Sequence, residues 1–302
     1  MKDHMSILEF CQRFPDEKTS AEFIAQQRWG GKPQCPHCGG DRIYRVQGSM
    51  AYKCAGCKKR FSVRTGTVME CSRLPLRTWL LAFYIMTTAK KGISSIQLAK
   101  ELGITQKSAW FLQQRIREAC DHRKNPLTGK VEVDEAYFGG KERNRHDDKR
   151  SGGGRGPVGK QAVVGMKGRD GTVRATPVER TNMATLKAVV GEHVDMAATV
   201  YTDEFGGYNT IPQQRETVCH SAGEYVRGQA HTNGIESFWA LLKRAYLGTH
   251  HWWSKRHCFR YVAEYAHRQN TKELTTGLLA IGRLVQQAVG KRLTYEGLTA
   301  AF

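Results

Sequence analysis

The sequence contains no apolar run long enough to cross a membrane. Its longest apolar stretch, around Trp79–Met86, lies between Arg77 and Lys90 and is far shorter than the roughly 20 residues that a spanning helix needs. The first residues, MKDHMSILEFCQRFPDE, mix acidic and basic side chains and lack the apolar segment and small-residue cleavage site of a secretory signal. We therefore predict no membrane segment and expect a cytoplasmic protein.

Acidic residues are scarce in this chain. It has 28 Asp and Glu against 47 Lys and Arg, which gives a formal net charge of +19. Such a basic chain favours an anionic partner, with nucleic acid as the first candidate and an anionic membrane surface as the alternative. The 302 residues, of which 40% are hydrophobic, suffice for two or three domains with at least one core. Internal repeats and coiled-coil heptads are absent from the sequence.

Cysteine is present in a number that does not suit a disulfide scaffold, because nine residues cannot all pair. Four of them form CPHC and CAGC, separated by fifteen residues: Cys35, Cys38, Cys54 and Cys57. Four thiolates at this spacing are typical of one tetrahedral Zn²⁺ in a zinc ribbon, and they leave no open position for a catalytic water. The following basic residues are predicted to contact DNA: Lys58, Lys59 and Arg60. The alternative is that zinc only stabilises a small domain.

A helix-turn-helix pattern follows the cysteine-rich segment. The sequence predicts a helix from about Ser94 to Leu102, a turn at Gly103, and a second helix that Thr105 opens. The apolar residues expected in its core are Ile96, Leu98, Ala99, Leu102, Ile104, Ala109 and Trp110. The second helix would face the DNA major groove with Gln106, Lys107, Gln113 and, as a further candidate, Arg117. Any amphipathic helical hairpin with a glycine turn gives a similar pattern, so this alternative stays open.

Three acidic residues lie where a metal-dependent reaction could use them. Asp134 ends the alternating run VEVD and Asp203 follows ATVYT, so both are predicted in or at the end of strands whose apolar neighbours bury them. A carboxylate buried there is costly without a cation. Glu236 lies on a predicted helix whose apolar stripe contains Phe238 and Trp239. The alternative is that these acids are merely solvated, as acids at strand edges often are; Glu132, Glu135 and Glu204 lie beside them.

The motifs VEVDEAYFGGK, VYTDEFGGY and HTNGIESFWALLKRAYLGTHH occur in this order, with 68 residues between Asp134 and Asp203 and 32 between Asp203 and Glu236. In these motifs the chain resembles bacterial insertion-sequence transposases with an N-terminal zinc ribbon and a DDE-type catalytic domain of ribonuclease H-like fold. The resemblance implies that Asp134, Asp203 and Glu236 hold two Mg²⁺ ions, or Mn²⁺ in their place, for DNA hydrolysis and strand transfer. Some members have Asn or His at the third position, which makes Asn233 and His231 the alternatives to Glu236.

The resemblance also implies the partners. They are double-stranded DNA, as transposon ends and as target, and a homodimer or larger assembly of the chain on that DNA. Lys243 matches the basic position of the family that is thought to hold the element end, and Arg244 follows it. We further predict that His250 and His251, with Trp252 and Trp253, contact DNA rather than a metal ion, because Lys255 and Arg256 follow them. The glycine-rich segment 141–160 is predicted to be a basic flap over DNA.

The predicted fold class is an α+β multidomain protein, in which a zinc ribbon and a helix-turn-helix precede an α/β ribonuclease H-like domain with a mixed five-stranded sheet. The predicted boundaries are 1–33 for N-terminal helices, 34–70 for the ribbon, 76–122 for the helix-turn-helix, 128–270 for the catalytic domain and 271–302 for a C-terminal helical segment. Competing functions are a DNA-binding regulator, another ribonuclease H-like nuclease, and an inactive copy. A tyrosine nucleophile at Tyr137 or Tyr208 is discounted, because the Arg and His partners of that chemistry are not recognisable.

Overall fold

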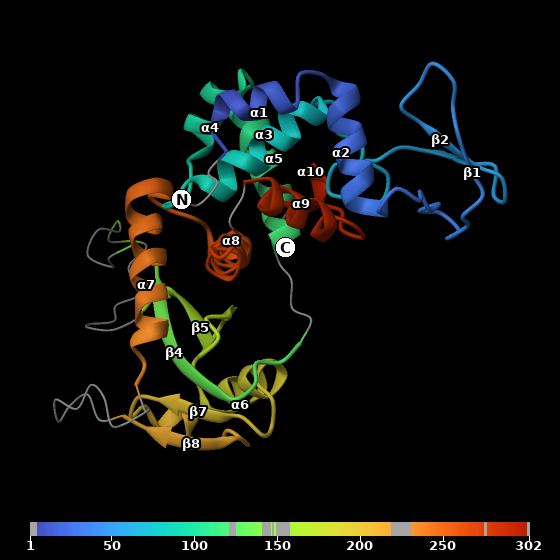
Figure 1. Ribbon diagram of the computed structural model, residues 1–302. Coiled ribbons are helices and arrows are strands. Elements are labelled where there is room, and N and C mark those ends of the chain that lie inside the picture. The colour runs from blue at the N-terminus through green and yellow to red at the C-terminus, as the bar shows by residue number, and fades with distance from the viewer. Residues whose placement is uncertain are drawn as a thin grey trace. The chain divides into compact units, whose positions relative to one another are not determined.

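A computed structural model describes residues 5–120, 125–140, 146, 148, 158–218, 231–274 and 277–300. The chain forms two compact units, one of residues Met1–Asp121 with Thr271–Phe302 and one of His122–Asn270 (Figure 1). Within the described residues, no helix is long and apolar enough to cross a membrane. Most of the predicted flap at 141–160 lies outside the described residues.

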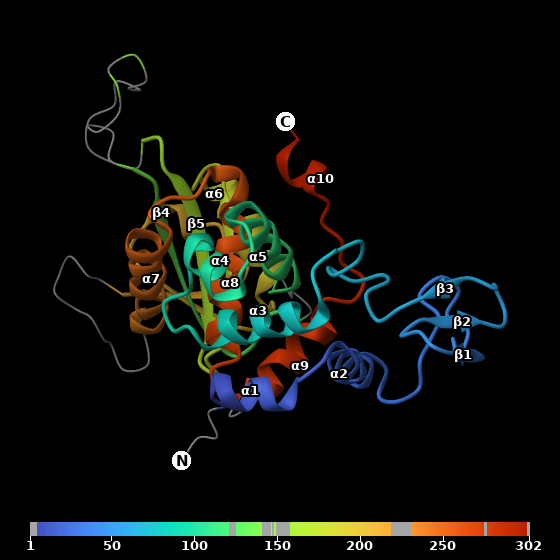
Figure 2. The ribbon, with the colours of Figure 1, turned by 90° about the horizontal axis from the view of Figure 1, so that it is seen from above.

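The first unit is built around a helical core. Ser6 and Asp16 cap two helices, α1 (Ile7–Arg13) and α2 (Glu17–Trp29), in the region where the sequence predicts N-terminal helices. Helix α3 (Leu76–Thr88) supplies Trp79, Leu80 and Phe83 to the core, and all three are fully buried. Helix α9 (Gly277–Gln287) packs against α2, α3 and α5, and Figures 1 and 2 show it in red beside the blue and cyan helices. The predicted C-terminal segment 271–302 thus belongs to the same unit as the N-terminal helices.

Two further helices of this unit confirm the hairpin that the sequence predicts. Ser94 caps α4 (Ser95–Leu102), Gly103 adopts the left-handed conformation with φ +64°, and α5 (Gln106–Cys120) follows. Leu98 and Ala109 are buried between them as expected. The sequence pattern places Ile96 in the same core, but 61% of it is exposed, so this prediction is wrong. The C-terminal α10 (Tyr295–Thr299) brings Tyr295 against Phe111 of α5.

The cysteine-rich segment forms a small antiparallel sheet of β1 (Ile43–Arg45), β2 (Tyr52–Cys54) and β3 (Arg60–Phe61). Trp29, at the end of α2, contacts the rings of Tyr52 and Phe61 edge-on. The ribbon has few buried apolar side chains of its own. Its fold therefore depends on this aromatic cluster and on a ligand that binds the four cysteines.

The second unit contains a mixed five-stranded sheet, which confirms that prediction. Its strands are β4 (Lys130–Phe138), β5 (Gln161–Gly168), β6 (Val173–Val178), β7 (Thr199–Thr202) and β8 (Gln214–Thr217), in the order β6-β5-β4-β7-β8. Strand β4 pairs antiparallel with β5 and parallel with β7. One face packs on α7 (Asn233–Ala245) and α8 (Cys258–Asn270) through Phe138 and Val163. The opposite face packs on α6 (Met183–His193) through Val131 and Val133.

Candidate active site and zinc centre

Asp134 lies within β4, and Asp203 lies just past the end of its parallel neighbour β7. The register pairs Val131 with Val200 and Glu132 with Tyr201, and its continuation by two residues places Asp134 beside Asp203. Asp203 directly follows β7, and its Oδ1 accepts a hydrogen bond of 3.1 Å from the Phe205 amide. The side chain of Arg215, on β8, donates to the carbonyl oxygen of Asp203 at 3.0 Å. The Phe205 amide and the Arg215 side chain therefore restrain the position of Asp203.

Asp134 is held in place by the indole of Trp239. Its Oδ2 accepts a hydrogen bond of 3.0 Å from Trp239 Nε1 on α7. Gly165 is the partner of Asp134 on β5, and a Cβ at Gly165 would lie only 2.4 Å from the Trp239 ring. A glycine is needed at this position because the indole lies directly on the sheet. The sequence pattern assigns Trp239 only to the apolar stripe of its helix.

Glu236 approaches the two aspartates from the first turn of α7. Its side chain is exposed, and its Oε1 accepts a hydrogen bond of 2.9 Å from the Thr232 hydroxyl. Burial raises the pKa of Asp134 to about 6, and the negative charges of Asp203 and Glu236 act in the same direction. Asp134 is therefore exposed to the charges of both other acids, and a divalent cation bound there would relieve that repulsion. The ligand atoms of the three acids do not all lie within 4.8 Å of one another.

A fourth acid, Glu135, follows Asp134 in β4. Burial raises the pKa of Glu135 to about 7, and the charges of Asp134 and Asp203 contribute to the rise. The hydroxyl of Tyr208, which is fully buried, donates a hydrogen bond of 2.6 Å to Glu135 Oε2. Glu135 is thus partly buried and hydrogen-bonded, in contrast to the solvated acid that sequence reasoning allows as the alternative.

Glu132 fixes the start of the helix that carries Glu236. Its side chain is only 3% exposed and forms an ion pair with Arg169. Glu132 Oε2 accepts a hydrogen bond of 2.7 Å from the Ile235 amide in the first turn of α7. From β5, Lys167 Nζ donates to the Gly234 carbonyl oxygen at 3.0 Å. Two strands of the sheet therefore hold the N-terminus of α7.

The two alternatives to Glu236 occupy different places on this side of the sheet. His231 Nδ1 lies 3.4 Å from Glu132 Oε1, and its ring also contacts Arg169. Asn233 is exposed at the first position of α7. Of the three candidates for the third ligand, Glu236 contributes to the raised pKa of Asp134.

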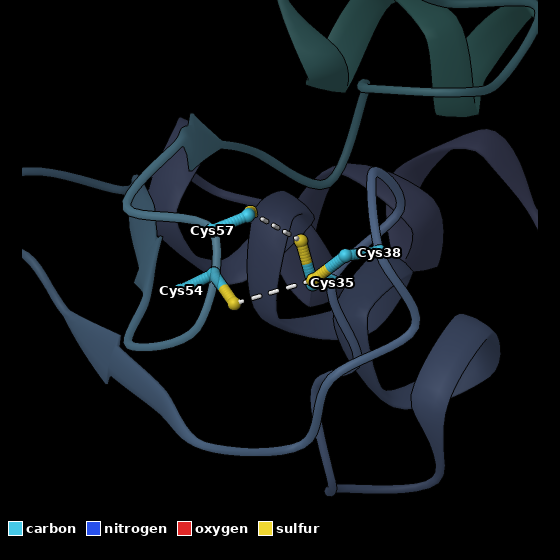
Figure 3. Close-up of side chains that lie close together, drawn as sticks. All are labelled: Cys35, Cys38, Cys54 and Cys57. Carbon is cyan, nitrogen blue, oxygen red and sulfur yellow. Dashed lines mark hydrogen bonds between the residues drawn. The ribbon is translucent and has the colours of Figure 1, made fainter.

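Cys35, Cys38, Cys54 and Cys57 come together as the sequence predicts, with their sulfur atoms facing one another (Figure 3). The Sγ atoms are 3.6 Å apart in the pairs Cys35–Cys57 and Cys38–Cys54. Sulfur atoms that bind one zinc ion tetrahedrally at about 2.3 Å lie about 3.8 Å apart, so the residues fit structural Zn²⁺. In the part of the chain that the structure describes, this is the one group of three or more His, Cys, Asp or Glu whose ligand atoms all lie within 4.8 Å.

Comparisons with known proteins found two matching family models and a similar protein. Residues 126–270 match the ISXO2-like transposase domain, and residues 15–60 match the transposase zinc-ribbon domain. The chain is also 32% identical over 274 residues to an uncharacterized protein in transposable element ISH50 from Halobacterium salinarum, a match that covers 85% of this chain and 92% of the relative. The chain belongs to the ISXO2-like transposase family. A transposase domain and a transposase zinc ribbon together imply DNA binding.

The residues that we predict as DNA contacts of this transposase-family chain differ in their accessibility. Lys58, Lys59 and Arg60 on the ribbon are exposed, as are Gln106 and Lys107 at the start of α5, Lys243 and Arg244 at the end of α7, and His251. Gln113 is 1% exposed, and its amide donates to the Ile93 carbonyl oxygen at 2.9 Å. The prediction that Gln113 contacts DNA is wrong, because the side chain is part of the helical core. Arg117, the further candidate on this helix, is fully buried as well, so its predicted contact with DNA is also wrong.

The residues of the predicted cluster from His250 to Trp253 also differ in their exposure. His250 is partly buried, and its Nε2 lies 3.0 Å from the Tyr265 hydroxyl. Trp253 is 5% exposed and stacks on Tyr261, so its predicted stacking on DNA is wrong. Trp252 is 64% exposed.

Proposed function

We propose that the chain is a DDE-type DNA transposase that binds the ends of an insertion sequence and carries out metal-dependent phosphodiester hydrolysis and strand transfer. The observation that supports this most directly is that Asp203, on the neighbouring strand, and Glu236, on α7, both raise the pKa of the partly buried Asp134. The sheet order and strand directions support a ribonuclease H-like catalytic domain. Family membership supports the transposase activity.

In this proposal Asp134, Asp203 and Glu236 would hold two Mg²⁺ or Mn²⁺ ions. The ions would supply charge stabilisation for the attacking and leaving oxygens. Trp239 orients the Asp134 carboxylate, and Glu132 keeps the first turn of α7, with Glu236, at the site. Water first cleaves the phosphodiester at the transposon end and leaves a 3′-hydroxyl. That hydroxyl then attacks a target phosphodiester, forming the new P–O bond as the target 3′-oxygen leaves.

Glu236 is the favoured third ligand over His231 and Asn233. His231 is already engaged by Arg169 and Glu132, whereas the charge of Glu236 acts on Asp134. We expect Glu236→Gln to abolish Mg²⁺-dependent cleavage of a transposon-end duplex, while Asn233→Ala and His231→Ala retain it. If Glu236→Gln still cleaves the duplex and either Asn233→Ala or His231→Ala does not, the third ligand is the residue whose substitution abolishes cleavage.

DNA binding is proposed to use exposed basic and polar residues of both units. The ribbon offers Lys58, Lys59 and Arg60, α5 offers Gln106 and Lys107, and the end of α7 offers Lys243 and Arg244. Because phosphate contacts release counterions, affinity should fall steeply with salt. Removing one phosphate-contacting lysine, as in Lys243→Ala, should reduce the slope of log affinity against log salt by about 1. An unchanged slope would remove Lys243 from the interface.

Two outcomes separate this function from its rivals. Cleavage of the element ends that requires Mg²⁺ and is lost in Asp203→Asn excludes a DNA-binding regulator. Joining of the cleaved 3′-end to a second duplex excludes a nuclease that only hydrolyses DNA. Chemical crosslinking on DNA would reveal the homodimer or larger assembly that holding two ends requires.

A further inference from the structure

Two large apolar side chains are exposed just after α7. Leu247 is 68% exposed and Trp252 is 64% exposed. Leu247 lies in a π-helical turn, η5 (Tyr246–His250), and Trp252 follows this turn. The side chain of His251 closes the turn by a hydrogen bond of 2.9 Å between its Nδ1 and the Leu247 carbonyl oxygen. Single exposed apolar residues are ordinary on protein surfaces. Two large ones presented by one turn are not explained by the packing of this unit.

The turn that presents them is rigidly anchored. Trp253, next to Trp252, is buried and stacks on Tyr261 with ring centroids 4.8 Å apart. It also meets the ring of Tyr246 edge-on at 4.5 Å. Between the anchored residues, His251 has φ +59° and ψ −37°, a conformation that non-glycine residues rarely adopt. Strain of this kind persists where surrounding structure imposes it and often accompanies function. The backbone of Trp252 is therefore held while its side chain remains in solvent.

The surroundings of this turn are basic and continuous with the candidate active site. Lys243, Arg244 and Lys255 are exposed on either side of it. Glu236, Ala240 and Lys243 are exposed at helical spacing, so they follow one face of α7, and the exposed Leu247 lies one turn further on, in η5. The eleven positions from Glu236 to Leu247 correspond to roughly 16 Å of helix. That length equals about five base-pair steps of duplex DNA.

We propose that Trp252, with Leu247, enters the transposon-end duplex about five base pairs from the cleaved phosphate, and that the indole stacks on a nucleobase that has left its normal stacking. The inference rests on the proposed function, because it takes DNA to lie along α7. Positive charge beside the pair complements the phosphates, and apolar wedges among basic residues are a common means of unstacking a base step. An aromatic face stacks on any base, so this contact favours distorted DNA without reading its sequence.

The test compares two substrates with the full-length protein. One is a fully paired duplex of the element end, and the other carries one mismatch four to six base pairs from the cleavage site. We expect Trp252→Ala to cleave the paired duplex at least about tenfold more slowly than the unsubstituted protein. The mismatched duplex should recover most of that loss, because its base is already unpaired. Trp252→Phe, which keeps an aromatic ring, should retain most of the activity on both.

Met196→Ala is the matched control, since Met196 is an equally exposed apolar residue of the same unit, and it should behave like the unsubstituted protein. Equal cleavage of the paired duplex by Trp252→Ala and the unsubstituted protein would overturn the inference while leaving the transposase function intact. If the unsubstituted protein cleaves neither duplex, the catalytic proposal fails, and equilibrium binding decides the inference. The inference is supported if the unsubstituted protein binds the mismatched end more tightly than the paired end and Trp252→Ala does not. It is overturned if both proteins show the same preference.

Discussion

Gly165→Ala should damage the catalytic centre although the change adds only one methyl group. The new Cβ would lie 2.4 Å from Trp239 Cζ2 and 2.6 Å from Cη2. Comfortable carbon contacts require about 3.5 Å or more, so the indole must retreat by roughly 1 Å. The ring is wedged between the sheet and its own helix, where Ile235 and Phe238 are buried. It cannot rotate away as a flexible side chain would.

The expected magnitude follows from two losses. Overpacking of a buried site costs about 1–3 kcal/mol, and the displaced Nε1 loses its 3.0 Å hydrogen bond to Asp134, which adds about 1 kcal/mol. We therefore expect a loss of about 2–4 kcal/mol, which lowers the melting temperature of a unit of this size by roughly 5–15 °C. Because Asp134 is also released from its orientation, cleavage of a transposon-end duplex should slow by about 100-fold.

Circular dichroism melting and Mg²⁺-dependent cleavage measure the two effects. Gly191→Ala is the matched control, because Gly191 lies in α6 and is exposed, and a Cβ added there would meet nothing within 4 Å outside its own helix; it should gain about 0.5–1 kcal/mol. In a Trp239→Leu background, the additional cost of Gly165→Ala should largely disappear. The reasoning is refuted if Gly165→Ala melts and cleaves like the unsubstituted protein.

Three other predictions concern the site of the carboxylates and the zinc site. Glu132→Ala should cost about 2–3 kcal/mol in urea denaturation, less than a fully buried pair because the Arg169 side chain is 29% exposed; Glu132→Gln, which still accepts from Ile235, should cost less, and equal costs would argue against the helix contact. Without divalent cations, the raised pKa values of Asp134, about 6, and Glu135, about 7, mean that the folded state holds these protons more tightly. Their contribution to stability should be present at about pH 4 and lost as the pH rises through 6 and 7. Mg²⁺ should restore stability most at high pH, and Asp134→Asn should flatten the profile; a flat profile in the unsubstituted protein would contradict the shift. The chain should bind one Zn²⁺ by elemental analysis, and Cys57→Ser should lose the zinc and the DNA affinity while the melting of residues 122–270 stays unchanged; retained zinc in that variant would contradict a four-cysteine site.

The sequence predicts features whose determinants are local. The four cysteines lie in two short motifs, so their spacing alone indicates their common ligand. Asp134 and Asp203 each follow an apolar strand pattern, so both strands could be predicted. That the two acids meet depends on the parallel register of β4 and β7, which no local pattern gives. The strands of the mixed sheet and the α4–α5 hairpin could also be predicted because their determinants are local. Apolar alternation, helix caps and a turn glycine can each be recognised within a few residues.

Features that depend on distant partners were missed. Glu132 looks like a strand-edge acid, because its partners Arg169 and Ile235 are 37 and 103 positions away. Gln113 looks like a recognition-helix residue, but its partner is the carbonyl of Ile93, and α5 also packs on α9 from the other end of the chain. The helical phase offered a signal for Gln113, since it adjoins Leu112 and precedes Ile116 by one turn, both of which are buried.

The return of α9 to the first unit has a consequence for how the protein is made. Ile281, Leu284 and Val285 are buried in the same core as Phe10 and Trp79, so that core is incomplete until nearly the whole chain has left the ribosome. The unit of residues 122–270 has its own sheet and helices and is synthesised earlier than the last piece of the N-terminal unit. A prematurely terminated product would expose the apolar surfaces of α2, α3 and α5 that α9 covers. Truncated chains should therefore be cleared by proteolysis rather than persist as competitors for the element ends.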